Sequence, residues 1–151
     1  MSNPNYDPNK LASIKTYILI AFIFNIIAII GFALGALSEI WAYATWSNVY
    51  GGILNYYAPG YSTGLLVSGI GILVFAVMAI LIFVMRVRPM YNAVNSGNIN
   101  TLKQYNNMMW AILALIFAGV LPGIMLLISF GPINELGQAT MSSPPPPPPP
   151  T

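Results

Sequence analysis

Three long apolar runs, separated by polar segments, set the pattern of this chain. They cover residues 17–37, 63–85 and 108–130, and no Asp, Glu, Lys or Arg interrupts any of them. A helix rises ~1.5 Å per residue, so ~20 apolar residues cross the ~30 Å hydrocarbon core of a bilayer. Each run is long enough to do so. The pattern predicts an all-α membrane protein with three transmembrane helices.

The segment between the first two runs, 38–62, is rich in aromatic residues and contains Glu39 but no basic residue. Tyr and Trp gather at membrane interfaces because the ring is apolar and its O–H or N–H reaches water. We therefore expect a partly helical loop on the extracytoplasmic face. A docking surface for a partner is the alternative to simple anchoring. The predicted interface anchors are Trp41, Tyr43, Trp46, Tyr50, Tyr57 and, at the start of the third run, Trp110.

The remaining segments are polar. In residues 1–16 we expect a helix to begin near Pro8 and to continue into the first run. Residues 86–107 form a basic, Asn-rich stretch that predicts a cytoplasmic loop. The tail, 131–151, includes seven consecutive prolines, which adopt the polyproline II conformation. Such a tail is either a ligand for an aromatic groove on a partner or a spacer, and we favour the spacer.

Small residues within the runs predict where helices pack, because they let two backbones approach closely. Asn25 is the polar exception in the first run, and we interpret it as a packing residue rather than a substrate or ion ligand. Pro122 leaves the carbonyl of Ala118 without its helical donor, which predicts a kink. The predicted helix-packing residues are Asn25, Gly31, Gly35, Gly64, Ser68, Gly71, Ala111, Ala114, Ala118, Gly119 and Gly123.

Composition supports the membrane class and limits the kinds of catalytic and metal-binding sites that the chain can form. Only 5% of the 151 residues are charged and the mean hydropathy is +0.73, whereas soluble domains carry about 25% charged residues. The chain has no His and no Cys, and its three acidic residues lie far apart in the sequence. Enzymes usually need a nucleophile with a base, a carboxylate pair or metal ligands. We therefore expect no catalytic residues, no metal and no cofactor, and the sparse basic residues do not predict nucleic-acid binding.

The charges also predict an orientation. With three spans, the N-terminal segment and the 86–107 loop share one side and contain every basic residue, namely Lys10, Lys15, Arg86, Arg88 and Lys103. Glu39 and Glu135 fall on the other side. The positive-inside rule then places the N-terminus in the cytoplasm and the C-terminus outside. A fourth span at 40–61 would put three basic residues outside, so we reject it.

These features predict a non-catalytic, multi-pass protein of the cell membrane that acts as a structural or accessory subunit of a larger assembly. Its partners would be the lipid bilayer and either other membrane subunits or further copies of the chain. The alternative is a small oligomeric pore or carrier. Asn25, Ser68 and Ser129 would be the polar lining of such a pore. A stoichiometric partner in mild detergent would favour the first function, and solute passage in liposomes the second.

The layout resembles that of small uncharacterised multi-span membrane proteins of archaea. The resemblance rests on the few spans, the Asn-rich hairpin NSGNINTLKQY, the Pro-Gly pair in the last run and the Pro-rich tail. It concerns layout and transfers no functional residue. It implies that a Pro-rich tail can be cytoplasmic, which the charge rule opposes for a chain with three spans.

Overall fold

The computed structural model describes residues 8–136, and this part of the chain is built from helices without a strand. The predicted all-α class is therefore confirmed over this range. Two helical stretches, Pro8–Tyr50 and Tyr61–Asn95, are long and apolar enough to cross a membrane. Only 17% and 22% of their most apolar windows are buried. These helices therefore present apolar surface outward, unlike the core helices of a soluble protein.

Helix α1, Pro8–Tyr57, is 50 residues long, which corresponds to about 75 Å at 1.5 Å per residue. No proline follows Pro8 until Pro59, so nothing in between removes a backbone donor. The helix continues through the aromatic segment that we expected to be a loop. It ends at Ala58-Pro59-Gly60, where Gly60 adopts a positive φ of 86° that favours glycine.

Helix α2, Tyr61–Ile82, runs through a π-helical turn, η1 (Phe83–Val87), into α3 (Arg88–Asn95). The π turn ends two residues before Pro89, whose ring has no N–H and clashes with the carbonyl four residues earlier in an α-helix. The wider turn lets the helix continue past this proline, beyond residue 85, where the second apolar run was predicted to end. Most of the predicted 86–107 loop is therefore helical, since α4 (Ile99–Tyr105) follows after a short turn.

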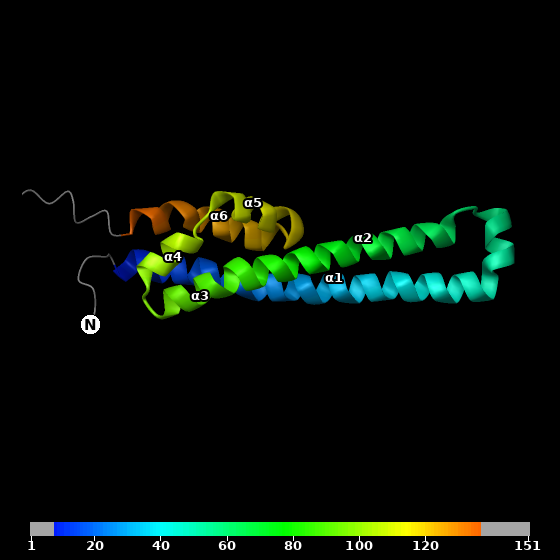
Figure 1. The fold of residues 1–151 in the computed structure, drawn as a ribbon, viewed down its shortest axis with the longest axis horizontal. Helices are drawn as coiled ribbons and strands as arrows, with labels where there is room; N and C mark the ends of the chain where they lie inside the picture. Colours follow the sequence, from blue (N-terminus) through cyan, green and yellow to red (C-terminus); the bar gives the residue numbers. More distant parts are fainter. Residues whose placement is uncertain (1–7, 137–151) are drawn as a thin grey trace, which may run out of the picture.

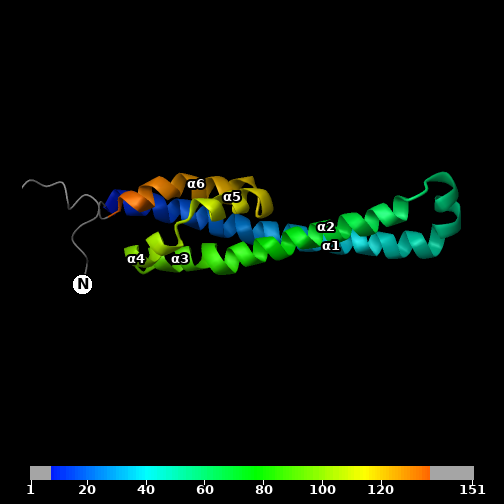
Figure 2. The same cartoon turned by 45° about the horizontal axis from the view of Figure 1, so that its top comes forward.

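Helices α1 and α2 form a long antiparallel pair, as Figures 1 and 2 both show. Ring contacts set the register, because Phe32 lies 5.9 Å from Phe75 and Phe22 lies 5.0 Å from Phe83 between ring centroids. Gly69 marks a close approach of the two helices, because a Cβ built there would lie 2.9 Å from Cγ1 of Ile40. The pair thus stays in contact well into the aromatic part of α1.

The third apolar run is two helices, not one. Helix α5, Met108–Phe117, ends at Ala118, and α6, Val120–Glu135, folds back along it. Gly119 makes the turn with a φ of 103°, a value that side-chain-bearing residues rarely adopt. Pro122 lies in the first turn of α6, where a helix needs no backbone donor. The kink expected at Pro122 is therefore a full reversal at Gly119.

The reversal changes where the described chain ends. Nζ of Lys10, near the start of α1, lies 2.9 Å from Oε2 of Glu135, the last residue of α6. The two ends were expected on opposite sides of the molecule, and this expectation is wrong for residues 8–136. Figure 1 shows α5 and α6 covering only the half of the α1–α2 pair that is nearer the start of α1. The Pro-rich run predicted to adopt the polyproline II conformation lies outside the described residues.

Candidate functional site

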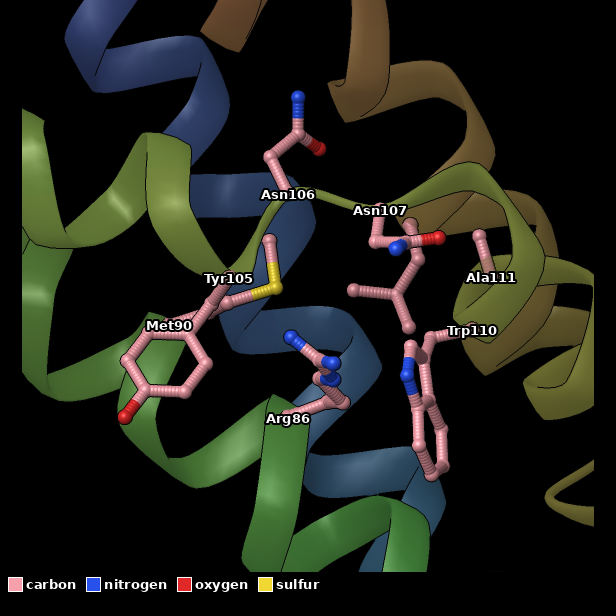
Figure 3. Close-up of a pocket in the computed structure, with 8 residues that line it drawn as sticks. Arg86, Met90, Tyr105, Asn106, Asn107, Trp110 and Ala111 are labelled. Atoms are coloured by element: carbon pink, nitrogen blue, oxygen red, sulfur yellow. The ribbon is translucent and has the colours of Figure 1, made fainter.

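The charged end of the α1–α2 pair holds a cluster of polar and aromatic side chains around Arg86. The guanidinium carbon of Arg86 lies 4.9 Å from the ring centroid of Trp110 and 5.8 Å from that of Tyr105. Figure 3 shows the arginine between these two rings. A cation over an aromatic face is stabilised by the ring quadrupole. Trp110, expected as a membrane anchor, therefore packs on Arg86 from the start of α5.

Three helical segments meet to form this cluster. Arg86 comes from the π turn η1, Tyr105 ends α4, and Trp110 belongs to the first turn of α5. A π turn shifts the following side chains around the helix relative to an α-helix, and such turns are frequent at functional sites. The position of Arg86 is thus linked to the proline that follows it.

Two asparagines hold the link between α4 and α5 in place. Asn106 donates through Nδ2 to the backbone oxygen of Phe130 and to Oδ1 of Asn134, both at 2.9 Å. Asn107 caps α5 by accepting the backbone N–H of Met109 at 2.9 Å. The Asn-rich character of this stretch therefore comes from helix capping and from bonds to α6.

A small pocket opens over the arginine. Its volume is about 10 Å³, close to the minimum for a single water molecule. Arg86, Tyr105, Asn106, Asn107 and Trp110 line it, together with apolar side chains. The Nε atom of Arg86 is buried and has no hydrogen-bond partner in residues 8–136. No carboxylate of the described residues lies within ion-pair distance of this arginine.

Asn25 is the second buried polar residue of interest. Its side chain is 0% exposed, and neither its Oδ1 nor its Nδ2 has a hydrogen-bond partner in the described part of the chain. It continues a buried stripe of α1 formed by Ile14, Ile18 and Ala21 at helical spacing. Asn25 therefore lies inside the bundle of this one chain, on the face of α1 that packs.

The predicted packing residues fall into two groups. Those of the third run pack: Ala111, Ala114 and Ala118 are buried, and a Cβ on Gly123 would lie 2.3 Å from Cα of Leu115. Gly35 makes ordinary contact with Ile72, 3.6 Å from its Cγ2. A Cβ on Gly31, Gly64 or Gly71 would meet nothing within 4 Å in the described chain, and Ser68 is exposed, whereas Asn25 is buried.

The predicted aromatic anchors lie on α1 rather than in a loop. Trp41 and Tyr57 are strongly exposed, Trp46 and Tyr50 moderately, and Tyr43 is partly buried. Trp46 packs at 4.8 Å on Tyr50 and at 6.5 Å on Tyr61 of α2, centroid to centroid. One side of this aromatic segment thus packs on α2, and the rest is uncovered in the single chain.

Sequence reasoning missed three features. Gly69 was not among the packing glycines, Arg86 was taken only as an orientation signal, and the Lys10–Glu135 pair crosses 125 positions. Only Arg86 could have been recognised from the sequence as part of a site, because it lies close to Arg88 and Pro89 at the end of an apolar run. The other two depend on which helices meet, which spacing along the chain does not reveal.

Residues 8–136 bring together no group of three or more carboxylates that could hold a metal ion, in a chain without His or Cys. Comparisons with protein-family models, curated proteins and solved structures find no match to this chain.

Proposed function

We propose that this chain is a non-catalytic integral membrane protein that acts as a structural or accessory subunit of a larger membrane assembly. In this proposal α1 and α2 each cross the bilayer, and the α5–α6 hairpin enters it from one side and returns. The sequence supplies none of the usual nucleophile, base or metal-ligand sets, so binding and packing are the activities that its residues support.

The charged residues suggest where the bilayer lies. Phe22 lies against Phe83 and, at 4.5 Å between ring centroids, against Tyr91, so it marks the level of Arg86 and Arg88. From Phe22 the next charge along α1 is Glu39. That distance is about 26 Å at 1.5 Å per residue, close to the ~30 Å hydrocarbon core. The uncharged layer of the pair therefore matches one bilayer.

The observation that carries the proposal is the length of α1 beyond this layer. Residues 40–57 extend about 27 Å past Glu39, farther than the headgroup region reaches. They carry no charge, and Val49, Ile53 and Tyr56 expose 63%, 63% and 81% of their surface at helical spacing. Lipid tails do not cover a face so far from the bilayer centre. An exposed apolar patch of this kind marks a protein contact.

The described basic residues lie at the end of the pair opposite to this extension. Lys10, Lys15, Arg86, Arg88 and Lys103 lie on α1 before Phe22, on η1 and α3, and on α4. By the positive-inside rule this end is cytoplasmic. Both ends of the described chain are then cytoplasmic, and the aromatic extension projects to the outside.

The α5–α6 hairpin favours the alternative, a pore or carrier, in one respect. Its turn lines one groove with Ile27 and Ala28, and Phe117 packs on Phe75, so the turn lies within the uncharged layer. Broken helices at this depth occur in channels and transporters. However, Ala118, Gly119 and the α1 residues that line the groove there are apolar. An apolar groove offers no ligand to an ion or a polar solute, so we place this function second.

A paired substitution tests the accessory-subunit proposal. We expect Val49→Ala with Ile53→Ala to lower the amount of any stoichiometric partner that co-purifies in mild detergent by about fivefold or more, the loss typical of interface anchors. The control is Ile30→Ala with Leu34→Ala, an equally spaced exposed pair inside the uncharged layer. The measurement is the partner-to-chain ratio after purification from native membranes.

Two results would contradict the proposal. One is a wild-type chain that purifies without any partner in fixed ratio and forms a homo-oligomer that passes solute in liposomes, which would establish the pore or carrier. The other is an equal loss of partner in both paired variants, which would mean that the extension beyond the bilayer is not the contact surface.

A further inference from the structure

We infer that the pocket over Arg86 is an anion site that takes one oxygen of a phosphate group, carried by an anionic phospholipid or by free phosphate. The inference rests on membrane insertion of the α1–α2 pair and not on the accessory-subunit role. It starts from a cation that has aromatic neighbours on two sides and no carboxylate from residues 8–136 within ion-pair distance.

Arg86 has unmet hydrogen-bonding capacity. Its Nε is buried without a partner in the described chain. A buried donor without an acceptor costs free energy, more so on a charged group. A guanidinium is a planar fork that matches the oxygens of phosphate and carboxylate. An anion oxygen in the pocket would provide the missing acceptor.

The pocket over Arg86 has the size and the further donors that suit an anion oxygen. A volume of about 10 Å³ admits one oxygen atom, so the rest of a phosphate would lie at the mouth. Asn107 uses its Oδ1 to cap α5, which turns its Nδ2 toward the side of Arg86 in Figure 3. The N-terminus of α5 starts at Met108, beside the pocket, and its helix dipole favours a negative charge there.

The electrostatic field at this end of the molecule also favours an anion. Lys103 on α4 and Arg88 on α3 add positive charge, while Glu135, the acidic residue that the structure describes at this end, is engaged by Lys10 at 2.9 Å. Anionic lipids accumulate in the cytoplasmic leaflet and are attracted to basic residues near its surface. Basic pockets between membrane helices on that side bind lipid headgroups.

The test uses the purified full-length chain in a neutral detergent. Native mass spectrometry measures bound phosphatidylglycerol and phosphatidylcholine from an equal mixture. We expect wild type to retain phosphatidylglycerol about tenfold or more over phosphatidylcholine, and Arg86→Gln to lose this preference. Arg88→Gln removes the same charge from an exposed position two residues away and should change the preference by no more than about fivefold, the share of one surface charge.

A second variant separates ligand binding from folding. Asn107→Asp keeps the acceptor that caps α5, removes the amide donor and adds a negative charge at the pocket. We expect it to melt at or above the wild-type temperature while losing the lipid preference as fully as Arg86→Gln. A purely structural role for Arg86 would leave the lipid preference of Asn107→Asp unchanged.

A third arm distinguishes the two sources of phosphate. Sodium phosphate, against sodium chloride at equal ionic strength, should raise the melting temperature of lipid-free wild type but not of Arg86→Gln if free phosphate occupies the site. If only phosphatidylglycerol shows the Arg86 dependence, the ligand is the lipid. Equal behaviour of wild type and Arg86→Gln toward both probes, or equal losses in Arg86→Gln and Arg88→Gln, would overturn the inference.

Discussion

Replacing Gly123 by Ala should separate α5 from α6 at a cost of about 3 kcal/mol in the free energy of unfolding, the upper part of the range for overpacking. A Cβ at this position would lie 2.3 Å from Cα and 2.5 Å from the backbone nitrogen of Leu115. Backbone atoms cannot rotate away as the end of a side chain can. The two helices would have to move apart, and the buried contacts of Ala111 and Ala114 would be lost with them.

Gly71→Ala is the matched control, because Gly71 lies inside helix α2, is not followed by a proline, and a Cβ there would meet nothing within 4 Å. Alanine has the higher helix propensity, so this variant should be unchanged or stabilised by up to about 1 kcal/mol. The free energies come from unfolding titrations with sodium dodecyl sulfate in mixed micelles, followed by circular dichroism. Equal stabilities of the two variants would show that α5 and α6 do not cross at Gly123.

Asn25→Leu should stabilise the protein by about 1–2 kcal/mol, because it removes a buried amide whose polar atoms are unpaired. Leucine has the same heavy-atom branching as asparagine, and the site is 0% exposed in an apolar stripe. Asn25→Asp, which keeps the shape and adds an unpaired carboxyl group, should destabilise the protein instead. The same detergent titration measures both variants.

A loss of more than about 1 kcal/mol in Asn25→Leu, the value of a typical hydrogen bond, would contradict this account. It would mean that the amide has a partner in the assembled membrane protein. A solute or ion role for Asn25, kept open by the sequence, would then regain support.

Hydrophobic patterning predicted the helical class and the positions of the two long helices. A long, continuous, uncharged run that enters lipid forms a helix, because a helix pairs the backbone N–H and C=O groups within the segment itself. The patterning did not predict that α1 continues to Tyr57. Tyrosine, tryptophan and paired glycines along this stretch are typical of an interface loop. These residues do not reveal that α2 packs against this part of α1. Gly69 of α2 packs on Ile40, and Tyr61 of α2 packs on Trp46.

The reversal at Gly119 shows a similar limit. Gly119 and Pro122 were visible as a disturbance in the third run, and a kink was the simplest outcome for a helix of that length. A fold-back needs tertiary contacts that spacing does not encode. These are the approach of Gly123 to Leu115 and the bonds from Asn106 to Phe130 and Asn134.

The candidate site depends on the reversal. Arg86 was predicted to lie at the cytoplasmic end of a span, and nothing in its neighbours along the chain pointed to Trp110. The α4–α5 link is fixed to α6 because Asn106, in the link, donates to the backbone oxygen of Phe130. This link places the start of α5 next to η1, and the Trp110 ring therefore lies against the guanidinium of Arg86. A signal for the site would have been an arginine next to a helix-disturbing proline, read together with a tryptophan at the start of the next apolar run.

We expect the chain to cross the bilayer with α1 and α2, and the α5–α6 hairpin to return to the cytoplasmic side. The chain has no cysteine, so single substitutions can be labelled cleanly. In intact cells, an impermeant thiol reagent should label Asn48→Cys and should not label Ser96→Cys or Ser142→Cys, while all three label after permeabilisation. Labelling of Ser142→Cys together with Asn48→Cys in intact cells would contradict the returning hairpin and establish a third complete span.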